Sequence, residues 1–148
     1  SAAGVRGIRL RDEDYVIGAA PLNSDSKVLV ISENGFGKQT PASEYPIKGR
    51  GGLGVKTVNV TAKNGPLVGL TTVNGDEDIM LVTDQGVIIR FGIESVSQTG
   101  RSAVGVHLIK MDNGARVATI AKVDKEVDEE TEEVTNNSSQ EENQPTEN

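Results

Sequence analysis

Apolar and polar side chains alternate along short stretches of the chain, and no stretch repeats its apolar residues with the period of a helix. Alternation with a step of two is typical of a β-strand that buries one face. In the middle of the chain it predicts four strands, at residues 53–61, 66–73, 78–83 and 87–91. The pattern therefore predicts an all-β fold in which Val, Ile and Leu supply the core.

Turn-forming residues separate the apolar runs. Asn-Gly between two such runs favours a tight hairpin in which both residues have positive φ. The predicted hairpin turns are Glu33-Asn34-Gly35, Asn64-Gly65, Asp84-Gln85-Gly86 and Asn113-Gly114.

The chain repeats itself at intervals of 50 and 51 residues. Residues 4–10, 54–60 and 105–111 each begin with Gly-Val, continue with a base or His, and then place apolar side chains two apart. The pair Gly49-Arg50 recurs as Gly100-Arg101.

These matches divide the body into three repeats, at about residues 1–48, 49–99 and 100–123. About 50 residues with four strands per repeat is typical of propeller blades, which bury their faces against one another. We interpret the body as the last two to three blades of a longer array.

The charge is unevenly distributed along the chain. The net charge is −7, but residues 124–148 hold ten of the 22 acids and one of the 15 bases, a charge of −9, which leaves +2 on residues 1–123. The tail has too few apolar side chains to form a core and is predicted to be disordered. It either solubilises the protein or competes, as a polyanion, for a basic surface on the body.

The residue inventory excludes several kinds of site. The chain has no cysteine, which excludes thiolate chemistry, and its single histidine is too few for a His-based metal site and leaves little support for a catalytic triad. The Gly-rich run at residues 49–54 matches a dinucleotide-binding fingerprint, but a strand-like segment follows it instead of a helix. The acidic triplets at residues 12–14 and 76–78 do not continue as calcium loops and are interpreted as turns. No catalytic residue, metal or cofactor is therefore expected within the chain.

Several of these motifs resemble the repeats in the C-terminal domain of the DNA gyrase A protein. The resemblance rests on residues 4–10, 33–40, 44–46 and 100–106, and the acidic tail is similar as well. It implies a β-pinwheel, a propeller-like array of four-stranded blades, that binds and bends duplex DNA around its rim. In a parent type II topoisomerase, that bending lets ATP-driven strand passage introduce negative supercoils.

The same resemblance implies a cytoplasmic bacterial enzyme, a heterotetramer with the gyrase B protein, in which ATP and magnesium are used outside this fragment. The C-terminal domain of the corresponding topoisomerase IV protein has a similar disc and is one alternative. A propeller-type scaffold for protein interactions is another.

One motif departs from the family pattern. The family's box reads Gln-Arg-Arg-Gly-Gly-Lys-Gly, whereas residues 48–54 read Lys-Gly-Arg-Gly-Gly-Leu-Gly, with Leu53 in place of the second Lys. We interpret this run as a degenerate copy of the box, so a full box is expected upstream if the parent has one.

Cations at recurring positions are the candidate DNA contacts. Wrapping duplex DNA requires many phosphate contacts without reading of bases, and glycine lets a backbone approach a phosphate closely. An ordinary solvated surface is the alternative interpretation, since most lysines and arginines are exposed. The predicted contacts are Arg6, Lys38, Lys48, Arg50, Lys56, Arg101 and His107, with Arg90 as a further candidate.

Overall fold

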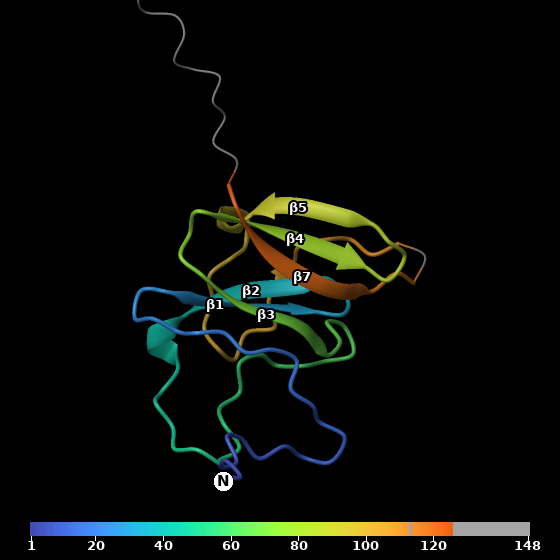
Figure 1. The fold of residues 1–148 in the computed structure, drawn as a ribbon. Coiled ribbons are helices and arrows are strands. Elements are labelled where there is room, and N and C mark those ends of the chain that lie inside the picture. The colour runs from blue at the N-terminus through green and yellow to red at the C-terminus, as the bar shows by residue number, and fades with distance from the viewer. Residues whose placement is uncertain (113, 126–148) are drawn as a thin grey trace, which may run out of the picture.

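Two antiparallel β-sheets enclose the core of the computed structural model, which describes residues 1–112 and 114–125 (Figure 1). The four-stranded sheet has the order β3-β1-β2-β6 and the three-stranded sheet the order β5-β4-β7. The first sheet consists of β1 (Lys27–Ser32), β2 (Phe36–Pro41), β3 (Leu67–Val73) and β6 (Val106–His107). The second consists of β4 (Glu77–Thr83), β5 (Ile88–Gly92) and β7 (Val117–Asp124). Single-turn 3₁₀ helices follow β2 and β5, namely η1 (Ala42–Glu44) and η2 (Ile93–Ser95).

The core lies between the two sheets, and the predicted alternation is present in β4, whereas β1 and β2 are buried along nearly their whole length. In β4, Ile79 and Leu81 are fully buried, whereas Met80 between them is half-buried. Leu29 and Ile31 of β1 belong to the same apolar cluster from the other sheet. Beneath the four-stranded sheet, residues 1–22 and 46–62 form a layer of irregular loops (Figure 1).

The hairpins β1–β2 and β4–β5 have the same local structure, as the sequence repeat requires. The amide of Gly35 donates to the carbonyl of Ser32 at 3.0 Å, and the amide of Gly86 donates to that of Thr83 at 3.1 Å. Both hairpins were predicted, but the expected turn type is wrong. Among the non-glycine residues of these turns none has positive φ, whereas Gly35 and Gly86 have φ of 79° and 81°. Three loop residues ending in a left-handed glycine replace the expected two-residue turn.

Each sheet is completed by a strand from a later repeat. β3, from the second repeat, pairs with β1 of the first, and β7, from the third, pairs with β4 of the second. β6, also from the third repeat, pairs with β2 at the other edge of the first sheet. A blade of this fold is therefore not the same segment as a sequence repeat.

The strand predicted at residues 53–61 is wrong. Gly52 forms only an isolated bridge with Ile8, and residues 53–61 pair with no other strand. Gly51 and Gly54 have φ of 75° and 76°, which interrupts an extended backbone. Val58 is nevertheless buried, so the apolar pattern indicated burial correctly but not the conformation.

Within the described ranges no helix is long and apolar enough to cross a membrane. Disorder was predicted for residues 124–148, but Asp124 is the last residue of β7 and pairs with Glu77. Residues 126–148 lie outside the described residues, as does Asn113 of the last predicted turn.

Candidate nucleic-acid interface

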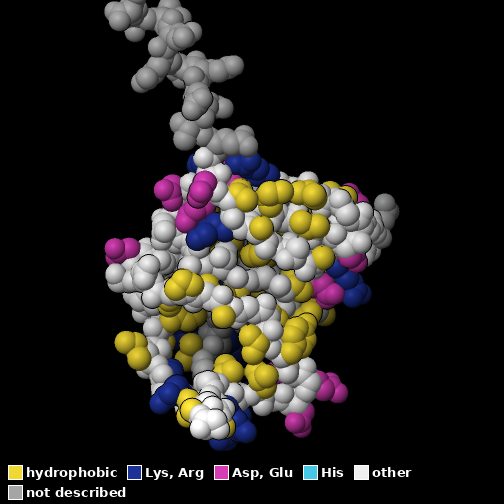
Figure 2. Space-filling model, viewed as in Figure 1, with side chains coloured by type: hydrophobic (Ala, Val, Ile, Leu, Met, Phe, Trp, Pro, Cys, Tyr) yellow, Lys and Arg dark blue, Asp and Glu magenta, His cyan; other side chains and the backbone are white. Residues whose placement is uncertain are grey.

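The glycine-rich loop brings two groups of predicted contacts together. The amide of Gly51 donates to the carbonyl of Gly7 at 2.9 Å, and the amide of Arg9 donates to that of Gly52 at 2.8 Å. These bonds lay the N-terminal segment, which carries Arg6, along the loop that carries Arg50. In Figure 2, Lys and Arg side chains lie at this lower end of the molecule next to exposed hydrophobic side chains, with Asp and Glu side chains to their right. The exposed cations of this loop group are Arg6, Arg9, Lys48 and Arg50.

Lys56 and Arg101 form a second pair, although 45 residues separate them. Arg101 is half-buried, and its Nη1 donates to the carbonyl oxygen of Lys56 at 2.9 Å. The Nε of Arg101 is buried and has no hydrogen-bond partner among the described residues. This contact joins two sequence positions that were predicted to carry DNA-binding cations.

Lys38 is the exception among the predicted contacts, and the structure corrects its assignment. Its side chain is fully buried on β2, and its Nζ donates to the carbonyl oxygens of Gly100 and Arg101 at 2.7 and 2.6 Å. Burial lowers the pKa of the Lys38 ammonium, the charge of Glu44 opposes this shift, and the charge of Arg101 adds to it. An amine in this position cannot reach a phosphate.

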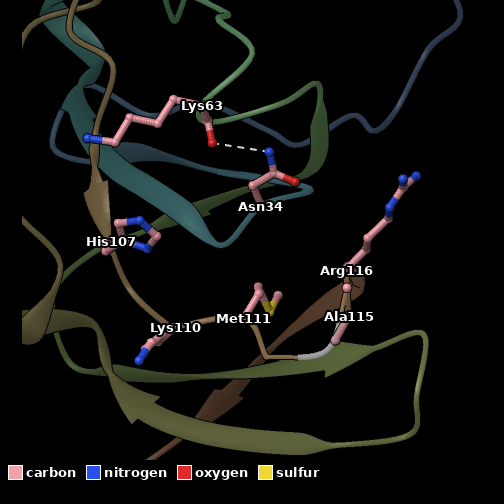
Figure 3. Close-up of a pocket in the computed structure, with 8 residues that line it drawn as sticks. Asn34, Lys63, His107, Lys110, Met111, Ala115 and Arg116 are labelled. Carbon is pink, nitrogen blue, oxygen red and sulfur yellow. Dashed lines mark hydrogen bonds between the residues drawn. The ribbon is translucent and has the colours of Figure 1, made fainter.

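His107 lies on β6, the strand at one edge of the four-stranded sheet. Its ring packs against Phe36 with a centroid distance of 3.8 Å and an interplanar angle of 45°. Its Nδ1 lies 3.3 Å from the carbonyl oxygen of Ile109. The ring remains exposed at the edge of an open hollow of about 540 Å³ (Figure 3).

Three further cations line this hollow, and sequence reasoning missed them. Lys63 lies with its Nζ 5.6 Å from the centre of the Phe36 ring, a cation–π geometry. Arg116 donates to Glu33 at 2.9 Å and is still largely exposed. In Figure 3, the Asn34 side chain donates to the carbonyl of Lys63 across the upper part of the hollow. The basic side chains of this hollow, called the hollow group below, are Lys63, His107, Lys110 and Arg116.

A sequence signal for the hollow group exists. Lys63 directly precedes Asn64-Gly65, and Lys110 and Arg116 lie on either side of Asn113-Gly114. Cations beside corresponding Asn-Gly pairs in two repeats are a recurring arrangement of the same kind as the Gly-Arg pairs.

Cations on the three-stranded sheet have protein partners. Arg90, the further candidate, donates to Asp78 at 2.7 Å and to the carbonyl of Asp124 at 3.2 Å. Lys122 donates to the carbonyl of Thr72 at 3.1 Å, and Lys125 pairs with Glu94 at 3.2 Å.

The acidic triplet at residues 12–14 lies at a turn, as predicted, but the turn predicted for the second triplet is wrong beyond Asp76, because Glu77 and Asp78 begin β4. The carboxylate of Glu77 is buried and accepts N–H donors from Asn74, Gly75 and Asp76 at 2.9–3.2 Å. Burial opposes ionisation of this carboxyl, but the three backbone donors and Lys122 outweigh it and lower its pKa. Within the described residues, no group of three or more acidic or histidine side chains is placed to hold a metal ion.

The chain is similar to several known proteins. Residues 1–23, 26–74 and 77–124 match the family model described as the DNA gyrase C-terminal domain, a beta-propeller. The DNA gyrase A protein of Staphylococcus epidermidis is 52% identical over 130 residues, which cover 86% of this chain and 15% of that protein. Its counterpart from Staphylococcus aureus is 49% identical over 134 residues, which cover 89% of this chain and 15% of that protein. The chain therefore spans about 15% of the length of these curated relatives.

Two solved structures share the architecture. A DNA gyrase A C-terminal domain matches with a TM-score of 0.63 and 28% identity, covering 66% of this chain and 33% of that one. The C-terminal domain of a DNA topoisomerase IV matches with a TM-score of 0.76 and 22% identity, covering 82% of this chain and 38% of that one, which shows the fold alone. The predicted all-β pinwheel is confirmed, with one four-stranded and one three-stranded sheet in the described part. Because the family model covers most of its residues, this chain belongs to the DNA gyrase A C-terminal domain family.

Proposed function

We propose that this chain binds duplex DNA, mostly through phosphate contacts, and bends it along its exposed loops. The observation that carries the proposal is a contrast between two sets of cations. Within the described residues, the loop group, Lys56 and His107 form no ion pair with a carboxylate. Arg90 and Lys125 on the three-stranded sheet do form such pairs.

Unpaired, exposed cations on glycine-rich backbone suit a polyphosphate. Each cation that neutralises a phosphate releases condensed counterions, which favours association at low salt. Gly51 and Gly54 have positive φ and no side chain, which leaves room for a phosphate oxygen to approach the backbone near Arg50, although the Gly51 amide itself donates to Gly7. No helix is available to enter a major groove within the described residues, which agrees with binding that does not read bases.

In the parent enzyme, we propose that this bending presents a DNA segment for ATP-dependent strand passage, so that DNA gyrase introduces negative supercoils. The relatives at 52% and 49% identity are DNA gyrase A proteins, whereas the topoisomerase IV domain is 22% identical, which favours gyrase over the alternative enzyme. The parent is proposed to be a cytoplasmic type II topoisomerase, a heterotetramer with the gyrase B protein. ATP and magnesium would act elsewhere in that complex, and this fragment would contribute no catalytic residue.

The test is DNA binding by the 148-residue chain as a function of salt. Affinity for duplexes of unrelated sequence should be equal, and log K should fall linearly with log salt by about 0.9 per phosphate contact. The triple variant Arg50→Glu, Lys56→Glu and Arg101→Glu should lose most of the affinity and reduce the salt slope by about three, one for each lost contact.

The matched control makes the same charge change on the three-stranded sheet. Arg90→Glu, Lys122→Glu and Lys125→Glu should retain most of the affinity, provided that circular dichroism shows a folded chain. Equal losses in the two triple variants would indicate a nonspecific charge effect. Salt-independent binding, or no binding, would instead favour the protein-interaction scaffold.

A further inference from the structure

Lys38 occupies a position that an apolar side chain could fill at lower cost. It is fully buried, and among the described residues no carboxylate lies within ion-pair distance of its ammonium. A buried charge is unfavourable unless strong hydrogen bonds compensate for lost water. The compensation here comes chiefly from two successive carbonyl groups, those of Gly100 and Arg101, and the charge of nearby Glu44 adds to it. The buried charge therefore holds the backbone of one Gly-Arg pair.

β2 holds the whole segment that leads to this pair. The amide of Gln39 donates to the carbonyl of Ser97 at 3.0 Å, and the amide of Thr99 donates to that of Gln39 at 2.9 Å. The Gln39 side chain donates to the carbonyls of Ile93 and Val96 at 2.8 and 2.7 Å. Lys38 extends this attachment by the last two residues, 100 and 101, where the segment turns toward Lys56.

The other Gly-Arg pair shows what the attachment adds. Within the described residues, no side chain donates to the carbonyls of Gly49 and Arg50, and Arg50 is exposed. Arg101 is half-buried, and its guanidinium is held on the Lys56 carbonyl. The equivalent of Lys38 in the next repeat, 51 residues later, is Ile89, so the second repeat offers no such amine.

We propose that Lys38 is a positioning residue of the interface: its buried ammonium fixes the backbone of Gly100 and Arg101, so that the Arg101 guanidinium is held beside Lys56 and the two cations meet the DNA as one unit. This inference rests on the proposed DNA-binding function for its consequence, but the attachment itself is testable without DNA.

The DNA-free test uses trypsin, which cleaves after arginine. In the unaltered 148-residue chain, cleavage after Arg101 should be slow relative to cleavage after Arg50. Mass spectrometry of limited digests measures both rates. Lys38→Met, which keeps the side-chain volume and removes the charge, should raise the Arg101 rate several-fold relative to the Arg50 rate. Thr40→Val is the matched control, because Thr40 is equally buried on β2 and its hydroxyl has no partner among the described residues. An unchanged ratio in folded Lys38→Met would overturn the proposal.

The DNA test is a double-mutant cycle. Lys38→Met should weaken DNA binding and reduce the salt slope by about one, as Arg101→Ala does, although Lys38 is not exposed. In the Arg101→Ala background, Lys38→Met should have no further effect, because it acts through Arg101. Additive losses would contradict this role. If the unaltered chain shows no salt-dependent DNA binding at all, the proposed function fails. The trypsin result then still shows whether Lys38 holds the backbone of Gly100 and Arg101.

A measurement on the unaltered chain covers the case in which Lys38→Met does not fold. Brief acetylation of amines should modify Lys48 and Lys56 in the free chain and leave Lys38 unmodified, and duplex DNA should protect the first two. Rapid acetylation of Lys38 that DNA suppresses would identify it as a direct contact and overturn the positioning role.

Discussion

Gly35 approaches Ile109 so closely that a side chain would not fit between them. A Cβ built on Gly35 would lie 2.7 Å from the carbonyl oxygen of Ile109, and the Gly35 carbonyl accepts the amide of Leu108 at 2.9 Å. This contact attaches the β1–β2 turn to the segment that follows β6. The second repeat has no such contact, since a Cβ on Gly86 would meet no atom within 4 Å.

Replacing the two turn glycines separates backbone strain from this contact. Gly86→Ala should cost about 1–2 kcal/mol of unfolding free energy, because alanine disfavours the left-handed region. Gly35→Ala should cost about 1–3 kcal/mol more, because backbone atoms must also move apart. Urea denaturation at neutral pH measures both values. Equal losses would show that the Gly35–Ile109 approach contributes nothing.

Glu77 should make the stability depend on pH. Its pKa is lowered in the folded chain, so the stability it contributes is present above the ordinary carboxyl pKa of 4.5 and is lost as the pH falls through the folded value. Glu77→Gln should lower the unfolding free energy at pH 7 by about 1.5–3 kcal/mol, since it weakens charge-assisted hydrogen bonds. It should also flatten the decline below pH 4.5. Thermal unfolding from pH 3 to 7 provides the measurement. Asp76 is an exposed neighbour of Glu77, and Asp76→Asn is expected to leave the stability of the unaltered chain unchanged over this range.

The hollow group should extend the DNA path beyond the glycine-rich loop. Lys63→Ala combined with Lys110→Ala should reduce the salt slope of DNA binding by about two, because each exposed amine would lose one phosphate contact. Lys122→Ala with Lys125→Ala removes the same charge from the three-stranded sheet and should leave the slope unchanged. Identical slopes for the two double variants would remove the hollow from the interface.

The acidic tail should weaken DNA binding at low salt. Residues 126–148 carry nine acids and no base, and a polyanion of that charge competes with phosphates for the same cations. Truncation after Lys125 leaves β7 whole and should tighten binding at low salt, with the difference disappearing as salt screens the charges. Affinities that agree at every salt concentration would leave the tail as a solubilising segment.

Local chemistry made part of this fold predictable. The hairpins at Gly35 and Gly86 follow from glycine between alternating runs, and the two turns repeat because their sequences do. The pairing of β3 with β1 and of β7 with β4 was not predictable, because alternation indicates which side chains are buried but not which strand lies alongside. Residues 53–61 show the same limit, since Val58 is buried without belonging to a strand.

The candidate site was predictable to a similar degree. The recurring positions predicted Arg6, Arg50 and Lys56 as contacts, and the structure places these three side chains on exposed loops. In the sequence, Lys38 cannot be told from an exposed lysine. Only the carbonyl groups that accept from its amine in the folded chain show that it is buried.

The exchange of strands between repeats determines where such an array can be cut into pieces that fold. A cut at the Gly-Arg pair of residues 49 and 50 would separate β3 from β1 and leave an unpaired sheet edge in each piece. A cut between β3 and β4, at residues 74–76, instead keeps a hairpin together with the strand that completes its sheet. The smallest piece that retains a complete sheet is therefore shifted by about half a period from the repeat that is visible in the sequence.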